Sequence, residues 1–192
     1  MNVALTHKAE GLERRAFTIA DVERMVEAGI ISPDERLEIL GGEIVPMSPK
    51  GSRHELIKNA INRQWGVRCP QRFGFVPETG LRLSSDTYLE PDFIVYELAV
   101  GLIAVKGPNV LLAVEVADAS LGYDLGRKPA IYAEFGVHEL WVIDAVARKV
   151  HVFRGVGPTG YAERSTVAAS DRVVPAVAPE AFAITLDALP PV

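Results

Sequence analysis

Hydrophobic residues recur at helical spacing in three segments of the chain. The first covers about 18–30, where Thr18 and Asp21 can form a capping box at the start. The second covers about 51–67, and one of its faces carries Leu56, Ile57, Ala60, Ile61 and Trp65. The third covers about 125–135 and ends at Gly136. We therefore predict three helices, the first of them near the N-terminus.

Short runs of β-branched and aromatic residues occur between these helices and after them, and they predict strands. They cover 36–40, 43–47, 73–76, 79–83, 93–96, 110–116, 137–143, 149–153 and 161–166. Gly41-Gly42, between the first two runs, predicts a tight hairpin. The runs at 110–116 and 137–143 are almost wholly apolar, as in central strands that are covered on both faces.

The order of the elements favours an α/β (or α+β) fold with a mixed central sheet flanked by helices. A helix and a hairpin precede this sheet, and a β-meander follows at the C-terminal end. The length of 192 residues suits a single domain over 1–192, in which we expect 1–16 to be loose and the proline-rich tail, 175–192, to follow the surface. The stretch from Gly155 to Gly160 has the letters of a dinucleotide-binding pattern, but Pro158 and the strand-like residues after it predict a hairpin loop.

Several features bear on where the protein acts. No apolar run approaches the roughly 20 residues of a membrane span, and the opening residues lack the apolar segment of a signal peptide. Cys69 is the only cysteine of the sequence, so no disulfide can form within the chain. We therefore expect a cytoplasmic protein that does not enter the membrane.

The formal net charge of −5 argues, taken alone, against binding to nucleic acid. The charge is unevenly distributed, however: 48–72 contains six basic residues and one acidic residue, so this stretch carries +5 and the remainder −10. The candidates for contacts with a phosphate backbone are Lys50, Arg53, Lys58 and Arg63. The alternative is a solvated helix face without a ligand.

Two carboxylates occur where apolar strands are predicted. Asp92 opens one strand, and Glu115 interrupts another. A buried carboxylate is costly unless it is paired or binds a cation. On adjacent strands, the two would form an oxygen-lined site for a hard divalent ion such as Mg²⁺. The alternative is that Glu115 forms an ordinary ion pair with Lys128 or Arg127 and that Asp92 caps a turn.

Five stretches of the sequence together resemble a known family. They are ERLEILGGEIVPMSP at 35–49, His54, Pro91-Asp92, VEVADAS at 114–120 and YDLGRKPAIYAEFGVHELWVID at 123–144. They resemble the putative restriction endonuclease family, abundant in cyanobacteria and other bacteria, which belongs to the PD-(D/E)XK nuclease superfamily. The resemblance extends from Glu35 to Phe153 and implies a restriction-endonuclease-like fold.

The resemblance implies that Asp92 and Glu115 are the metal carboxylates and that the main-chain carbonyl of Val116 joins them. In the signature of the superfamily, a lysine stands two residues after the acid, but this chain has Ala117 there. The resemblance places the lysine on the following helix instead, as Lys128. A proline follows this lysine directly, so we expect Lys128 in the first turn of its helix.

Two further positions match the family. Superfamily members often bring an acid from their N-terminal part to the metal, and Glu43 is a better candidate than Glu38 because it precedes the turn that leads to His54. His54, near the start of its helix, could contact a phosphate or assist proton transfer. The alternative is a surface histidine that caps the helix.

The resemblance thus implies a metal-dependent endonuclease that hydrolyses phosphodiester bonds in DNA, with Mg²⁺ or Mn²⁺ as the cofactor. We expect a homodimer, because two copies would cut the two strands. The alternative is a non-catalytic module that retains the nuclease fold and binds nucleic acid or another partner. The departures from the family pattern, Ala117 and Pro129, leave room for this alternative.

Overall fold

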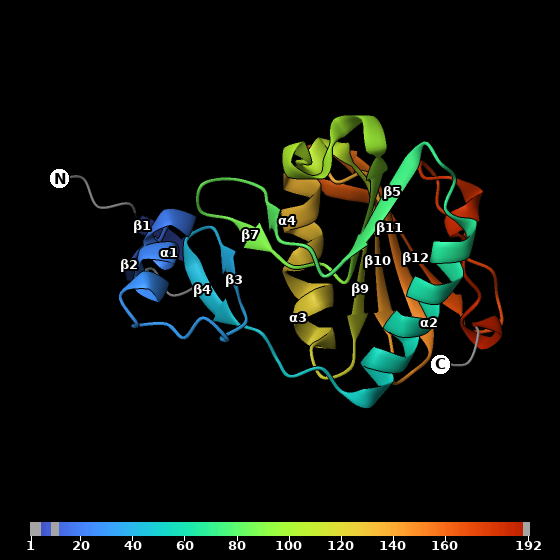
Figure 1. Ribbon diagram of the computed structural model, residues 1–192, viewed down its shortest axis with the longest axis horizontal. Helices are drawn as coiled ribbons and strands as arrows, with labels where there is room; N and C mark the ends of the chain where they lie inside the picture. The colour runs from blue at the N-terminus through green and yellow to red at the C-terminus, as the bar shows by residue number, and fades with distance from the viewer. Residues whose placement is uncertain (1–4, 9–11, 190–192) are drawn as a thin grey trace. The chain divides into compact units, whose positions relative to one another are not determined.

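The computed structural model describes residues 5–8 and 12–189, and its contacts divide the chain into two compact units (Figure 1). The smaller unit consists of Met1–Ser48 and Gly80–Glu90, and the larger unit of Pro49–Thr79 and Pro91–Val192. The chain therefore leaves the larger unit once and returns to it. None of the described helices combines the length and the apolar character that crossing a bilayer requires.

In the smaller unit, the described residues form a helix and two antiparallel sheets. The elements are β1 (Leu5–Lys8), β2 (Leu12–Arg15), α1 (Ile19–Glu27), β3 (Leu37–Leu40), β4 (Glu43–Pro46), β6 (Leu81–Arg82) and β7 (Tyr88–Leu89). β1 pairs with β2, and the four-stranded sheet has the order β4-β3-β7-β6. The predicted capping box opens α1: the Asp21 N–H donates to Thr18 Oγ1 at 3.1 Å, and the Thr18 N–H donates to the Asp21 carboxylate at 2.9 Å.

Part of the N-terminal segment differs from the expectation. Residues 5–8 and 12–15, expected to be loose, pair as antiparallel strands, whereas 1–4 and 9–11 lie outside the described residues. The pairing rests on main-chain hydrogen bonds, which the mostly polar sequence of this segment does not signal.

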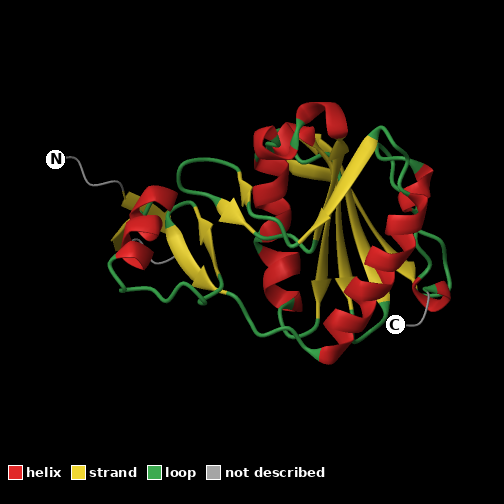
Figure 2. Cartoon of the chain, in the orientation of Figure 1, coloured by secondary structure: helices red, strands yellow, loops and turns green. Residues whose placement is uncertain are grey.

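The larger unit is built on a six-stranded sheet (Figure 2). Its helices and strands are α2 (Ser52–Arg68), β5 (Phe73–Pro77), β8 (Phe93–Glu97), β9 (Val110–Ala117), α3 (Leu121–Gly126), α4 (Lys128–Glu134), β10 (Leu140–Asp144), β11 (Lys149–Gly157) and β12 (Gly160–Ala168). Short 3-10 helices cover Leu98–Val100, Leu102–Ala104, Gly107–Asn109, Glu180–Phe182 and Leu186–Ala188. The strand order is β12-β11-β10-β9-β8-β5; β9 and β10 run parallel, and the other neighbours run antiparallel. The predicted mixed sheet flanked by helices is confirmed, and the glycine-rich stretch forms the β11–β12 hairpin.

The third predicted helix is divided into α3 and α4. Arg127 separates the two, and α4 begins at Lys128 with a proline in its first turn. A single helix through Pro129 would lack the hydrogen bond that a main-chain N–H at this position would donate four residues back. Lys128 therefore stands in the first turn of a helix, as predicted.

The core of the larger unit lies between the sheet and α2. It contains Leu112, Val114 and Val116 from β9 together with Ile57, Ile61 and Trp65 from α2. Because side chains alternate along a strand, Glu115 points to the opposite face, where it meets α4. One expected core residue is missing: Leu56 is 55% exposed.

The C-terminal tail completes this core. Phe182 is fully buried, and its ring stands edge-on to that of Trp65 with 5.1 Å between the ring centroids. Ile184 is also buried and forms a β-bridge with Val173. The expectation that 175–192 follows the surface is therefore wrong for this part of the tail, and its last three residues lie outside the described ones. Prolines and alanines around these two apolar residues conceal the pattern in the sequence.

Candidate active site

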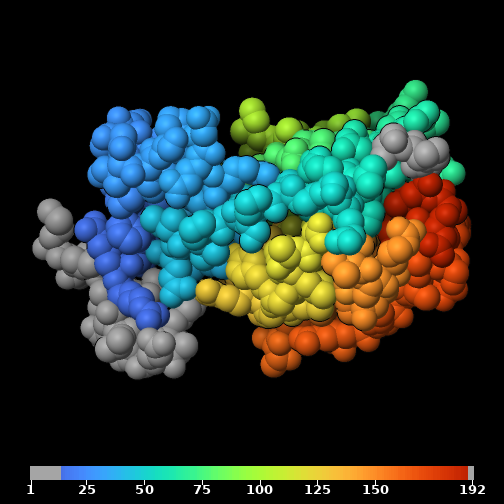
Figure 3. Space-filling model, turned by 90° about the horizontal axis from the view of Figure 1, so that it is seen from below, coloured from blue at the N-terminus to red at the C-terminus, as the bar shows by residue number. Residues whose placement is uncertain are grey.

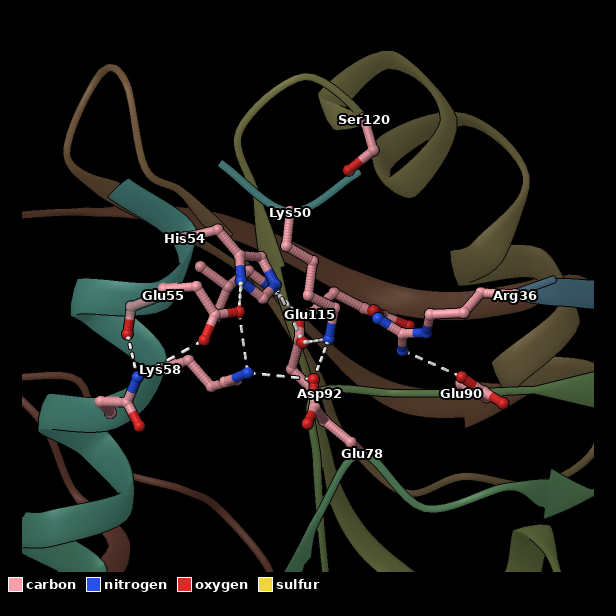
Figure 4. A network of polar contacts seen from close by, with 12 residues as sticks. Arg36, Lys50, His54, Glu55, Lys58, Glu78, Glu90, Asp92, Glu115 and Ser120 are labelled. Atoms are coloured by element: carbon pink, nitrogen blue, oxygen red, sulfur yellow. Dashed lines mark hydrogen bonds and ion pairs between the residues drawn. The ribbon is translucent and has the colours of Figure 1, made fainter. Parts of the chain in front are cut away.

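Asp92 and Glu115 meet at one end of the large sheet. Phe93 of β8 pairs with Val114 of β9 in antiparallel register, so the next residues along, Asp92 and Glu115, stand opposite each other. Each of the two is only 4% exposed. The structure thus brings together the two carboxylates that the sequence singled out (Figure 4).

The Asp92 carboxylate accepts three hydrogen bonds. Its Oδ2 accepts from the main-chain N–H of Val116 at 2.7 Å, and its Oδ1 from His54 Nε2 at 2.9 Å and Lys50 Nζ at 3.0 Å. Burial raises the pKa of Asp92, but the hydrogen bond from His54, the charges of His54 and Lys50 and the Val116 N–H together outweigh it, so this pKa lies below its ordinary value. Asp92 is therefore an anion at neutral pH. The alternative, in which Asp92 caps a turn, is not what the structure shows.

The Val116 carbonyl faces the same edge of β9 as Asp92. In a strand, the N–H and C=O of one residue point to the same edge, and those of the next residue to the other edge. The Val116 N–H donates to Asp92, while the Ala117 carbonyl accepts from Ala145 on the side of β10. The Val116 carbonyl therefore lies on the edge where the resemblance requires a metal ligand.

Glu115 is held from the other face of the sheet. Its Oε1 lies 3.0 Å from Lys128 Nζ and accepts a hydrogen bond from the Tyr132 hydroxyl at 2.6 Å. Lys128 Nζ also lies 3.2 Å from Asp124, and all three charged side chains are buried. The ion pair between Glu115 and Lys128 that the alternative proposed is thus present, and it brings the expected lysine to the expected acid.

The Tyr132 hydroxyl offers a test of how strongly this site is held. We expect Tyr132→Phe to lower the free energy of unfolding by about 1.5–3 kcal/mol, because a buried donor to a charged acceptor is lost. Tyr161→Phe is the matched control: that hydroxyl is also buried, but it donates to a neutral carbonyl, of Val137. Its loss should cost only about 0.5–1.5 kcal/mol in urea denaturation. Equal losses in the two variants would contradict a charged acceptor at Tyr132.

A second set of charges flanks Asp92. Lys50 Nζ contacts both Asp92 and Glu78, and Lys58 Nζ lies 2.9 Å from Glu78 and 2.8 Å from Glu55. The hydrogen bond from Lys50 lowers the pKa of Glu78 to about 2, a shift that burial opposes and Lys58 reinforces. These ion pairs keep Lys58 buried, so it does not lie on a solvated helix face, which was the alternative.

His54 belongs to the same network. It is buried in the first turn of α2, with Nε2 facing Asp92 and Nδ1 at 3.1 Å from Glu55 Oε1. Because a carboxylate lies at each ring nitrogen, both hydrogen bonds form together only when the ring carries two protons. The alternative of a surface histidine is excluded.

The N-terminal turn of α2 lies beside the segment that leads into α3 (Figure 3, α3 in yellow). Gly51, the N-cap of α2, permits this approach, since a Cβ atom there would lie 2.2 Å from Asp118 Oδ2. Arg53 Nη1 lies 3.8 Å from the same carboxylate. The helix whose His54 reaches Asp92 therefore begins close to the segment that leads into α3.

Three carboxylates at the site were not predicted: Glu55, Glu78 and Asp124. Asp124 stands four residues before Lys128, a spacing typical of helical ion pairs that could have identified it. Glu55 stands three residues before Lys58 and could have been found in the same way. No local signal marks Glu78, because its two lysine partners come from a distant part of the chain.

The remaining predicted residues are Glu43, Arg53 and Arg63. Glu43 opens β4 and pairs with Leu40, so it belongs to the smaller unit, whereas Asp92 and Glu115 belong to the larger one. The Arg53 side chain is 66% exposed. Arg63 lines a groove of about 600 Å³ along the outer face of α2, together with Ser52, Glu55, Leu56, Asn59 and Asn62.

The donor set at the end of the sheet suits a hard divalent cation. Mg²⁺ typically binds one or two carboxylates and keeps several waters. Among the residues that the structure describes, no group of three or more His, Cys, Asp or Glu side chains could hold a metal ion. A cation here would therefore use Asp92, Glu115 and the Val116 carbonyl, with water completing its shell.

A comparison with families of known proteins bears on what this site does. The sequence model of the Uma2 family, described as "Putative restriction endonuclease", matches residues 19–187. The chain belongs to this family. The resemblance found in the sequence is thereby confirmed, and membership in Uma2 indicates a nuclease.

One solved structure supports the same fold for this Uma2 chain. The crystal structure of a putative nuclease belonging to DUF820, from Anabaena variabilis ATCC 29413, matches with a TM-score of 0.67 and 15% identity, over 90% of this chain and 97% of that one. The type IIG restriction endonuclease BpuSI matches with a TM-score of 0.40 and 15% identity, over 65% of this chain and 15% of that one. None of the curated proteins that were compared matches the chain.

Proposed function

We propose that this Uma2 chain is a metal-dependent endonuclease that hydrolyses phosphodiester bonds in DNA, with Mg²⁺ or Mn²⁺ held by Asp92, Glu115 and the Val116 carbonyl. The observation that supports this most strongly is the placement of two buried carboxylates opposite each other on neighbouring strands, each beside a lysine. A nuclease fold alone would not require this arrangement. Family membership adds the nuclease chemistry.

The metal would polarise a phosphoryl oxygen and lower the pKa of a bound water. Lys128 holds a positive charge beside Glu115, where it can offset the negative charge that develops on the phosphate. Tyr132 fixes the same carboxylate from α4 by its hydrogen bond. His54 orients Asp92 and can contact a phosphate or transfer a proton.

Contacts with the phosphate backbone are proposed for Lys50, Arg53 and Arg63, on or beside α2. Phosphate contacts of this kind position a protein on DNA without reading its sequence. Lys58 is proposed to act only through its ion pairs, and Glu43 remains a candidate acid from the smaller unit. A homodimer in the cytoplasm that cuts the two strands of a duplex completes the proposal.

Metal dependence is the direct test. Purified protein should nick supercoiled plasmid in Mg²⁺ or Mn²⁺, and an excess of EDTA should stop the reaction. The Glu115→Gln variant, purified in the same way, controls for a contaminating nuclease. Equal nicking by the two proteins, or nicking that EDTA does not affect, would overturn the proposal.

A non-catalytic module with the same fold is the second candidate. It is favoured by Ala117, which stands where the superfamily signature has its lysine, and by the two lysines that balance both carboxylates without a metal. Calorimetry separates the candidates: the absence of Mn²⁺ binding at millimolar concentration would favour the module.

A further inference from the structure

Lys50 occupies one of the lone-pair positions of Asp92 through which a metal ion could bind. Its Nζ lies 3.0 Å from Asp92 Oδ1 and contacts Glu78 at the same time. The side chain is 15% exposed, and it comes from the short segment that precedes α2. Lys50 thus lies between two carboxylates, only one of which is a proposed metal ligand.

The other partners of Asp92 are less able to leave. A carboxylate has about four lone-pair sites, and three hydrogen bonds already occupy Asp92. The Val116 N–H is fixed by β9, and His54 is buried in α2. Of the three donors to Asp92, only Lys50 has a long flexible side chain that already contacts a second carboxylate, that of Glu78. If Lys50 left Asp92, its charge would therefore stay paired.

We infer that Lys50 competes with the metal ion for Asp92: it neutralises this carboxylate in the metal-free protein and shifts wholly onto Glu78 when a divalent cation binds. This inference rests on the proposed function, because it concerns the same metal site. An ammonium and a divalent cation repel each other strongly when they share one buried carboxylate. Lys128 differs, since it begins α4, is buried and is also held by Asp124.

The inference predicts opposite effects for two substitutions in the full-length protein. Lys50→Met should tighten Mn²⁺ binding about tenfold, since the competing cation is gone; a tenfold change corresponds to about 1.4 kcal/mol. Glu78→Gln should weaken Mn²⁺ binding, since the displaced lysine loses its negatively charged partner and keeps only a neutral amide oxygen. In the Lys50→Met background, Glu78→Gln should have a much smaller effect, because the lysine that would move from Asp92 onto Glu78 is then absent.

The measurement is isothermal titration calorimetry with Mn²⁺ alone, at one pH and one ionic strength. Arg53→Met is the matched control, because it removes one positive charge from the same region but has no contact with Asp92. It should change the affinity by less than about threefold. If circular dichroism shows that Lys50→Met does not fold, Lys50→Gln replaces it with the same expected direction.

The possible outcomes separate this inference from the proposed function. If the natural protein binds Mn²⁺ and Lys50→Met binds it no more tightly, the competition is refuted and the metal site stands. If Mn²⁺ binds to neither protein, both proposals fail. Binding by Lys50→Met alone, or much tighter binding by it than by Arg53→Met, supports the competition.

Discussion

Replacing Asp92 by asparagine is expected to lower metal-dependent cleavage of DNA by roughly 100-fold or more. The amide lacks the negative charge with which Asp92 would hold a divalent cation. Only two protein ligands would then remain, Glu115 and the Val116 carbonyl. The fold should survive, because the amide oxygen can still accept the Val116 N–H and Lys50 keeps its contact with Glu78. Initial rates of plasmid nicking in Mg²⁺, together with circular dichroism, measure both effects.

Glu97→Gln is the matched control for this prediction. Glu97 ends the same strand that Asp92 precedes, but at its opposite end, where it pairs with Arg72 on the surface. The same chemical change there should leave the rate of nicking within about twofold, because an exposed ion pair contributes little. Comparable losses of activity in both variants would show that Asp92 has no special part in cleavage.

Replacing Lys128 by methionine is expected to produce the largest loss of stability at the site. It leaves Glu115 and Asp124 buried without the ammonium group that lies within 3.2 Å of both. Removing one partner of a buried ion pair costs about 3–5 kcal/mol, and urea denaturation in EDTA should show a loss of this size. Cleavage should fall as well, because the positive charge beside the phosphate is lost.

Magnesium should restore part of the stability lost in Lys128→Met, because a divalent cation at Glu115 supplies positive charge to the same carboxylates. Arg154→Met provides the comparison. It also removes a cation from a buried carboxylate, that of Glu139, which lies apart from the proposed metal ligands and keeps hydrogen bonds from Trp141 and Ala176. If Mg²⁺ stabilises both variants equally, no metal binds at Glu115.

The sequence locates the two central carboxylates because each breaks an apolar pattern. Glu115 interrupts a run that is otherwise buried, and Asp92 opens another, so burial demands a partner for each. The position of Lys128 in the first turn of a helix is also predictable, since the proline after it disfavours the helical conformation for the residue before it. These positions follow from neighbouring residues, whereas the assignment of Lys128 to the site came from the family resemblance.

Other parts of the structure depend on contacts between distant residues, which no local pattern reveals. Glu78 meets Lys50 and Lys58 from a different element, and Phe182 fills the space beside Trp65 although the chain around it is rich in proline and alanine. Lys58 was expected to contact a phosphate backbone. Its partner Glu55 is visible in the helical spacing, but Glu78, the second carboxylate beside it, is not. The smaller unit is likewise assembled from two separate segments of the chain.

Glu78 and Asp92 flank Gly80–Glu90, the second of the two segments that form the smaller unit. The chain passes into the smaller unit at Gly80 and is back in the larger unit at Pro91. Just outside these two points, the Glu78 N–H donates to the Asp92 carbonyl at 3.1 Å. The excursion therefore has its two ends tied together at its base, while β6 and β7 within it join the sheet of the smaller unit. The position of Asp92 at this base is thus held by a main-chain hydrogen bond that does not depend on which side chains the segment 80–90 carries.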